Sequence, residues 1–199
     1  MKNKNFTLGA IMLMFGLFLG NSQTTKAQEI ISGDLSFLKN QTSINVVFDF
    51  TKFKLEKETE AEFLAREVAD KNKKEAGSGD KFKENWINDR DVKFVEAFKK
   101  VLGERVRIPV NDPNAKYTLV VCNINLTNKG WGNKISGGNP AEMIVDFKFV
   151  ETANQNNIVC LLREGRTRYM AMTGTLSQKV QGCLEYSTAF LAKNMKKYL

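Results

Sequence analysis

The chain has 199 residues and a formal net charge of +8, and 42% of its residues are hydrophobic. This length suits a single domain that buries a core without metal or disulfide staples. The chain contains no histidine, which excludes Ser-His-Asp and Cys-His catalysis, histidine-based zinc sites and histidine pH switches.

The first 27 residues have the order of a secretory signal peptide. Lys2 and Lys4 give a positive start, residues 8–19 form an uncharged apolar run, and small residues precede a cleavage position after Ala27. A permanent membrane anchor stays open as the alternative, although the apolar run is shorter than the ~20 residues that a span needs.

Cleavage would leave residues 28–199 as one exported domain, periplasmic or extracellular. Lys2, Lys4 and Lys26 leave with the signal peptide, which lowers the net charge from +8 to +5. This mild charge does not predict a nucleic-acid partner. No cysteine near the cleavage position offers a site for a lipid, so we expect no lipid anchor. Cleavage also removes the apolar run, so we expect no stable membrane span afterwards.

The first half of the domain predicts a strand followed by two helices. Residues 43–50 alternate between apolar and polar side chains, which is typical of a strand with one buried side. A capping box opens a helix over residues 59–75, and the spacing is helical again over residues 80–102. We expect Asn88 and its neighbour to bend or split this second helix, and Gly103 to end it.

The second half predicts mainly strands. Four segments are expected to form an antiparallel meander: residues 105–110, 116–126, 141–151 and 158–162. A second capping box at Thr175 opens a last amphipathic helix. The fold class is therefore α+β, an antiparallel sheet of about four to five strands with two to three helices packed mainly on one face.

The three cysteines, Cys122, Cys160 and Cys183, lie on predicted apolar strand or helix faces. Each fits a small buried hydrophobe. Three buried thiols, or one disulfide plus one buried thiol, are the two arrangements left open. No C-x-x-C spacing supports a redox motif.

The connection at residues 127–140 is the best candidate for binding. It is long for a hairpin loop, and glycines flank Trp131 on both sides, with Lys129 and Lys134 nearby. An exposed indole beside cations suits a sugar ring, an aromatic ligand or a protein partner. The alternative is that Trp131 folds back to cover the sheet edge.

A second candidate is the arginine-rich segment that contains Arg163, Arg166 and Arg168 beside Tyr169. We expect it in a strand-to-helix loop, where arginine side chains can bind carboxylate or phosphate in a bidentate manner. The alternative is an ordinary solvated surface.

Three carboxylates, Glu84, Asp89 and Asp91, lie beside Trp86 and Arg90. A glycosidase needs two carboxylates that face each other across a cleft, and residues close together on one helix rarely have that geometry. Helix-surface charge with one Asp–Arg contact is the alternative. The glycines match no nucleotide-binding fingerprint.

Several segments together carry a family resemblance. These are the basic start with its Ala27–Gln28 junction and the stretches GDLSFLKNQTSINVVFDF, KEAGSGDKFKENWINDRDVKF, AKYTLVV and IVDFKFVETAN. They resemble a family of small exported proteins from Bacteroides-like bacteria, over nearly the whole mature chain. The resemblance implies export and a single domain, and it supplies no catalytic residues.

The leading hypothesis is an exported, non-enzymatic binding or assembly protein of the cell envelope. Its partner would be an envelope protein or a glycan, and we expect no cofactor, metal or nucleic acid. The alternative is an exported carboxylate-dependent hydrolase acting on glycan or peptide. The candidate ligand-binding residues are Lys129, Trp131, Lys134, Arg163, Arg166, Arg168 and Tyr169.

Overall fold

The computed structural model describes residues 28–128, 139–171 and 175–199. The strands are β1 (Glu29–Gly33), β2 (Asn45–Phe48), β3 (Lys54–Leu55), β4 (Glu58–Thr59), β5 (Tyr117–Asn128), β6 (Asn139–Glu151) and β7 (Asn154–Ala171). The helices are the 3-10 turn η1 (Ser36–Leu38), α1 (Glu60–Lys74), α2 (Ser78–Asn88), the π-helix η2 (Asp89–Phe94), α3 (Val95–Val106) and α4 (Leu176–Met195).

The strands form one seven-stranded sheet in the order β1-β7-β6-β5-β3-β4, and β2 also pairs with β5. β5, β6 and β7 are consecutive antiparallel neighbours, so the predicted meander is confirmed for these three strands. β2 and β3 run parallel to β5, one after the other along its free edge. The sheet is therefore mixed and has more strands than the four to five predicted.

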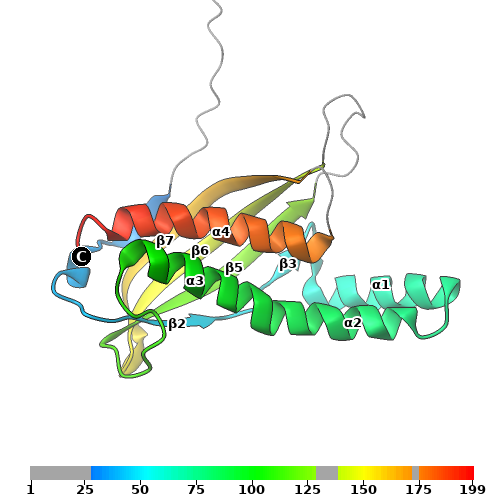
Figure 1. Cartoon of the computed structure of the whole chain (residues 1–199), viewed down its shortest axis with the longest axis horizontal. Helices are drawn as coiled ribbons and strands as arrows, with labels where there is room; N and C mark the ends of the chain where they lie inside the picture. Colours follow the sequence, from blue (N-terminus) through cyan, green and yellow to red (C-terminus); the bar gives the residue numbers. More distant parts are fainter. Residues whose placement is uncertain (1–27, 129–138, 172–174) are drawn as a thin grey trace, which may run out of the picture.

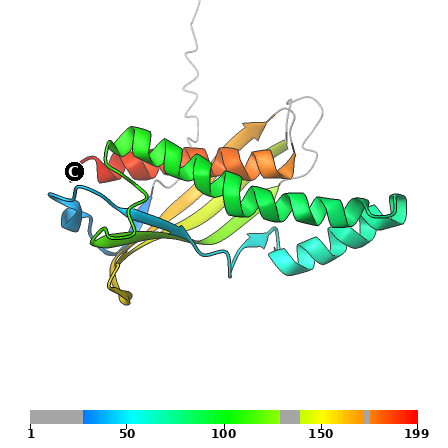
Figure 2. The same ribbon diagram turned by 60° about the horizontal axis from the view of Figure 1, so that its bottom comes forward.

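The helices confirm the predicted α+β layering. Figures 1 and 2 show α3 and α4 side by side over one face of the sheet, with their carboxyl ends at the same end of the molecule. The α1–α2 pair extends beyond the opposite end of the sheet (Figure 1). No helix among the described residues is long and apolar enough to cross a membrane.

Both predicted capping boxes are present. Thr59 caps α1 and Thr175 caps α4, and each hydroxyl accepts a hydrogen bond from the backbone N–H three residues on, at 3.3 Å in both cases. The side chains of Glu62 and Gln178 accept the reciprocal bonds from the two threonine N–H groups at 2.8 Å. These bonds satisfy N–H groups that a helix start otherwise leaves unpaired.

The helix after α1 is longer than predicted and runs without a break from Ser78 to Val106. The polar pair that begins with Asn88 does not split it, and the winding instead widens to a π-helix over Asp89–Phe94. The prediction that Gly103 ends the helix is wrong, because the left-handed residue after the last turn is Arg107, with φ of 63°.

The predicted strand over residues 105–110 is also wrong, because α3 continues into this segment. Arg105 and Val106 form the last turn of α3, and the following residues belong to a loop. The strands that the sequence did not indicate are short: β3 and β4 have two residues each. β1 has five residues, all exposed, so it has no apolar alternation to detect.

The core lies between the sheet and the helix layer. Alternate residues of β6 point into it, and Met143, Val145, Phe147 and Phe149 are fully buried, as their period of two predicted. Phe98 of α3 is also fully buried.

Gly79→Ala is expected to destabilise the protein by several kcal/mol, because α1 and α2 cross at this position without room for a side chain. A Cβ atom on Gly79 would lie 2.3 Å from the carbonyl oxygen of Val68, so the backbone would have to move. Urea unfolding measures the effect. The control is Gly103→Ala. Its Cβ would meet only a methyl group of Val110 at 3.3 Å, and replacing glycine by alanine favours the helix by about 1 kcal/mol. Equal stability of the two variants would contradict the prediction.

Candidate functional site

The three predicted loop residues, Lys129, Trp131 and Lys134, lie outside the described residues. β5 continues to Asn128 and β6 begins at Asn139, so part of the predicted connection belongs to strands. The binding role of Trp131 stays a prediction.

The arginine-rich segment is not a loop, because β7 runs through it to Ala171. Arg163 lies directly opposite Asp146 of β6, and Arg168 lies directly opposite Glu142. Opposite charges on facing positions stabilise a strand pair. This pairing with β6 explains why the segment is extended and hydrogen-bonded.

Both ion pairs have a buried carboxylate and a half-exposed guanidinium. Arg163 donates to Asp146 at 2.7 and 2.9 Å, and Asn123 donates to the same carboxylate at 2.9 Å. Arg168 donates to Glu142 at 2.6 Å. These carboxylates hold both arginines against the sheet, and the hydrogen bonds to Asp146 raise the pKa of Arg163.

The sheet divides the predicted arginine cluster. One extra residue of β7 between Glu164 and Thr167 brings Arg163 and Arg168 to the same face. Tyr169 follows Arg168 directly and therefore points to the other face, where its ring lies against Gly182 of α4. The side chain of Arg166 lies outside the described part of the chain.

A different site lies at the turn between β2 and β3, the two short strands that pair one after the other with β5. A groove of about 740 Å³ opens there, and its lining includes Phe48, Asp49, Phe50, Glu60, Arg90 and Lys148. We call it the edge groove and define it by these six residues. The first turn of α1 supplies Glu60, η2 supplies Arg90, and β6 supplies Lys148.

The turn between β2 and β3 forms one wall of the edge groove. The backbone N–H of Asp49 makes a last hydrogen bond to Val121 of β5 at 2.9 Å. The Asp49 carboxylate then accepts bonds from the Thr51 hydroxyl at 2.6 Å and the Thr51 N–H at 3.0 Å. These two bonds lower the pKa of Asp49, the hydroxyl contributing more.

Glu60 and Arg90 form the opposite wall. Arg90 donates to Glu60 at 2.6 Å and to Asp91 at 2.7 and 3.0 Å, and these bonds raise its pKa, with Asp91 as the largest cause. The buried indole of Trp86 donates to the second oxygen of Glu60 at 2.7 Å. Side chains from α1, α2 and η2 therefore fix one another beside the groove.

An aromatic surface completes the site. The rings of Phe48 and Phe50 stack with centroids 5.3 Å apart and planes at 28°, and both are partly exposed. The guanidinium of Arg90 lies over the Phe50 ring at 5.3 Å, within the range of a cation–π contact. The edge groove thus combines an apolar face with two acidic and two basic side chains.

The three carboxylates singled out from the sequence do not face one another across this groove. Asp91 pairs with Arg90, and Asp89 pairs with Lys93 one turn along the helix at 2.6 Å. Glu84 lines a separate shallow hollow on the outer side of α2, together with Asp91. Helix-surface charge, the alternative reading of these residues, describes Asp89 and Glu84.

All three cysteines are buried and free, which is the first of the two predicted arrangements. Burial raises the pKa of Cys122 and Cys160 to about 11 and that of Cys183 to about 12. The reactive thiolate form is therefore disfavoured at all three positions.

Glu164 is a buried carboxyl that the sequence did not single out. It faces α4 from β7 and is 4% exposed. Thr167 bonds one of its oxygens at 3.4 Å and bridges to Ser187 of α4 at 2.8 Å. The other oxygen has no partner among the described residues. Burial raises its pKa to about 7.

Sequence reasoning missed the edge groove because its parts are distant in the chain. Phe50 and Arg90 come together only when β2 pairs with β5 and the chain returns along α2 to place η2 beside the turn that follows β2. The only signal in the sequence is the alternation over residues 43–50, which predicts Phe48 and Phe50 on the buried face of one strand.

No known family model matches the chain, and no curated protein sequence matches it. Among solved structures it is similar to two structures of the PelC dodecamer from Paraburkholderia phytofirmans, one of them a leucine-to-methionine variant. The variant has 13% identity and a TM-score of 0.37, over 86% of this chain and 97% of that chain. The other has 12% identity and a TM-score of 0.36, over 86% and 96%. We draw no argument from a similarity at this level.

Proposed function

We propose that this protein is an exported, non-enzymatic binding or assembly protein of the cell envelope, and that the edge groove binds a glycan. The N-terminal 27 residues support export, because they have the order of a signal peptide. The resemblance of nearly the whole mature chain to small exported proteins supports the same location.

The chemistry of the edge groove supports a neutral, hydroxyl-rich ligand. Its acidic and basic side chains balance, since Asp49 and Glu60 are matched by Arg90 and Lys148. Together they offer both donors and acceptors, which a sugar ring needs on its edges. The rings of Phe48 and Phe50 stack on each other and are both partly exposed, so they offer apolar contact area for the C–H side of the sugar beside these charges. This pairing of an aromatic face with balanced charges is the observation that carries the proposal.

Phe50→Ala is expected to weaken glycan binding about tenfold, because it removes the aromatic face and leaves the charged wall in place. Binding is measured by isothermal titration calorimetry on the unlabelled protein, so that both tryptophans stay in place. The probes are soluble peptidoglycan fragments and purified surface polysaccharide fragments. Phe190→Ala is the matched control, because Phe190 is a half-exposed phenylalanine on α4 outside the groove.

Three results would overturn the proposal. One is that no probe binds, and another is that Phe50→Ala and Phe190→Ala weaken binding equally. The third is that the protein cleaves a probe and that Asp49→Asn abolishes this cleavage. That result would support the alternative function, a carboxylate-dependent hydrolase.

A further inference from the structure

The ends of α3 and α4 together form a basic surface, which we call the basic tip. It is a hollow of about 370 Å³ whose lining includes Arg105 from the last turn of α3, and Phe190, Lys193 and Lys196 from the end of α4. The two helices end side by side because they run in the same direction over the sheet (Figure 1).

Among the described residues, the cations of the basic tip have no acidic partner. None of the ion pairs among the described residues involves Arg105, Lys193 or Lys196, and no carboxylate lines the hollow. Lys197, one residue farther along, bonds only the neutral side chain of Asn194 at 3.0 Å. Arg163 differs from these cations, because its charge is already neutralised by the buried carboxylate of Asp146. The basic tip is therefore a place where positive charge is available to a partner.

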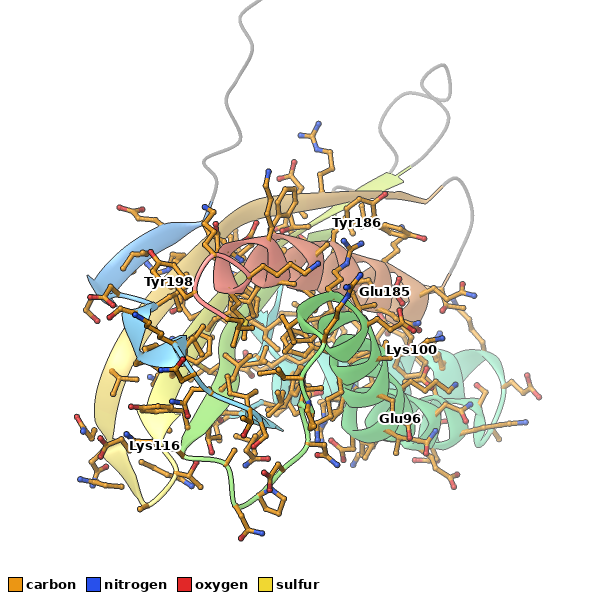
Figure 3. All side chains as sticks on the ribbon, turned by 60° about the vertical axis from the view of Figure 1, so that its left-hand side comes forward. Glu96, Lys100, Lys116, Glu185, Tyr186 and Tyr198 are labelled. Carbon is orange, nitrogen blue, oxygen red and sulfur yellow. The ribbon has the colours of Figure 1, made fainter. Side chains whose placement is uncertain are left out.

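Large apolar side chains are exposed beside these cations. Phe190 is 50% exposed, and at the chain end Tyr198 and Leu199 are 37% and 39% exposed. Figure 3 views the molecule from this end and shows Tyr198 just past the end of α4. Cations mixed with exposed aromatic and aliphatic groups fit the boundary between lipid headgroups and acyl chains. A soluble acidic partner needs the charge and not the apolar groups.

The N-terminal segment joins the domain at this same end. Gln28 accepts a hydrogen bond from Asn194, in the last turn of α4, at 2.7 Å. The 27 residues before it contain the apolar run 8–19. The chain therefore enters the described domain at the end that carries the basic tip.

We propose that the basic tip binds an anionic lipid surface, with Arg105, Lys193 and Lys196 at the phosphate level and Phe190 inserted among the acyl chains. Three observations favour a lipid surface as the partner. The cations complement anionic headgroups, the exposed Phe190 ring suits the acyl region, and Gln28 joins the N-terminal segment to this end of the domain. This surface is separate from the edge groove, so the inference does not depend on glycan binding.

The test uses protein recovered after expression of the full chain, and sedimentation with two kinds of vesicle. One kind holds equal parts of phosphatidylglycerol and phosphatidylcholine, and the other holds phosphatidylcholine alone. Binding only to the anionic vesicles is expected. It should fall as salt rises from about 0.01 M to about 1 M, because the Debye length shrinks from about 30 Å to about 3 Å.

The variant Arg105→Gln/Lys193→Gln/Lys196→Gln is expected to lose on the order of 100-fold in affinity, because each cation at an anionic surface contributes about a fivefold factor. The control Lys74→Gln/Lys81→Gln/Lys83→Gln removes the same charge from the exposed α1–α2 end and should retain most of the binding. Phe190→Ala is expected to weaken vesicle binding, whereas Phe50→Ala should not.

Four outcomes would overturn the proposal. They are equal binding to both kinds of vesicle, no binding to either, equal losses in the two triple variants, and binding to polyglutamate as tight as to vesicles and unchanged in Phe190→Ala. The last of these would identify a soluble acidic polymer as the partner.

Discussion

Phe98→Ala is expected to lower the free energy of unfolding by about 3–5 kcal/mol, the range for removing a fully buried aromatic side chain. The Phe98 ring meets Phe48 of β2 edge-on at 5.3 Å and lies 6.0 Å from Phe147 of β6. Its loss opens a cavity where α3, the central meander and the parallel edge strand meet. Urea unfolding followed by circular dichroism measures the change.

The control for this variant is Ile158→Ala, because Ile158 is 49% exposed on β7. A surface substitution of this kind is expected to change stability by no more than about 0.5 kcal/mol. If Phe98→Ala also changed the free energy of unfolding by no more than about 0.5 kcal/mol, the result would contradict the described packing of α3 on the sheet.

Glu164→Gln is expected to stabilise the protein at pH 8 by up to about 3 kcal/mol and to have little effect near pH 4. Burial raises the pKa of the folded carboxyl to about 7, above its ordinary value of 4.5. The folded state therefore holds this proton more tightly than the unfolded chain does. Stability contributed by protonated Glu164 is complete below about pH 4.5 and is lost as the pH rises through about 7.

The measurement is urea unfolding of the wild type and Glu164→Gln across this pH range. The two stability curves should separate between about pH 4.5 and 7 and then run parallel. Glu104→Gln, an exposed side chain on α3, is the matched control. A constant difference between wild type and Glu164→Gln at every pH would contradict the buried-carboxyl explanation.

The parts of the fold that were predictable have strong local signals. Met143, Val145, Phe147 and Phe149 follow a period of two, and they form the buried face of β6. The threonine–glutamate and threonine–glutamine capping boxes mark helix starts within one residue. In each case the pattern that predicts the structure lies within a short stretch of the sequence.

The parts that failed depend on partners that are distant in the sequence. Arg163 and Arg168 look like surface-loop residues until Asp146 and Glu142 are placed opposite them across the sheet. β3 consists of two residues, so only pairing with Asn125 and Leu126 of β5 defines it as a strand.

The candidate site also depends on partners that are distant in the sequence. The charged and aromatic residues around Trp86 and Arg90 were predicted to interact only with the carboxylates next to them in the chain. The structure keeps the contact between Arg90 and Asp91 and also turns Trp86 and Arg90 toward Glu60, because α2 packs alongside α1. A local sequence window does not contain that packing.

The order of strand pairing also determines when this chain can fold. β1 pairs with residues 160–163 of β7, and β2 pairs with residues 118–121 of β5. Both early strands must therefore wait for segments that are synthesised much later, and closing such long loops slows folding. Whether the chain folds during synthesis or after the export that we propose, β1 and β2 stay unpaired until β7 and β5 are present. The C-terminal half therefore sets the moment at which the sheet can close.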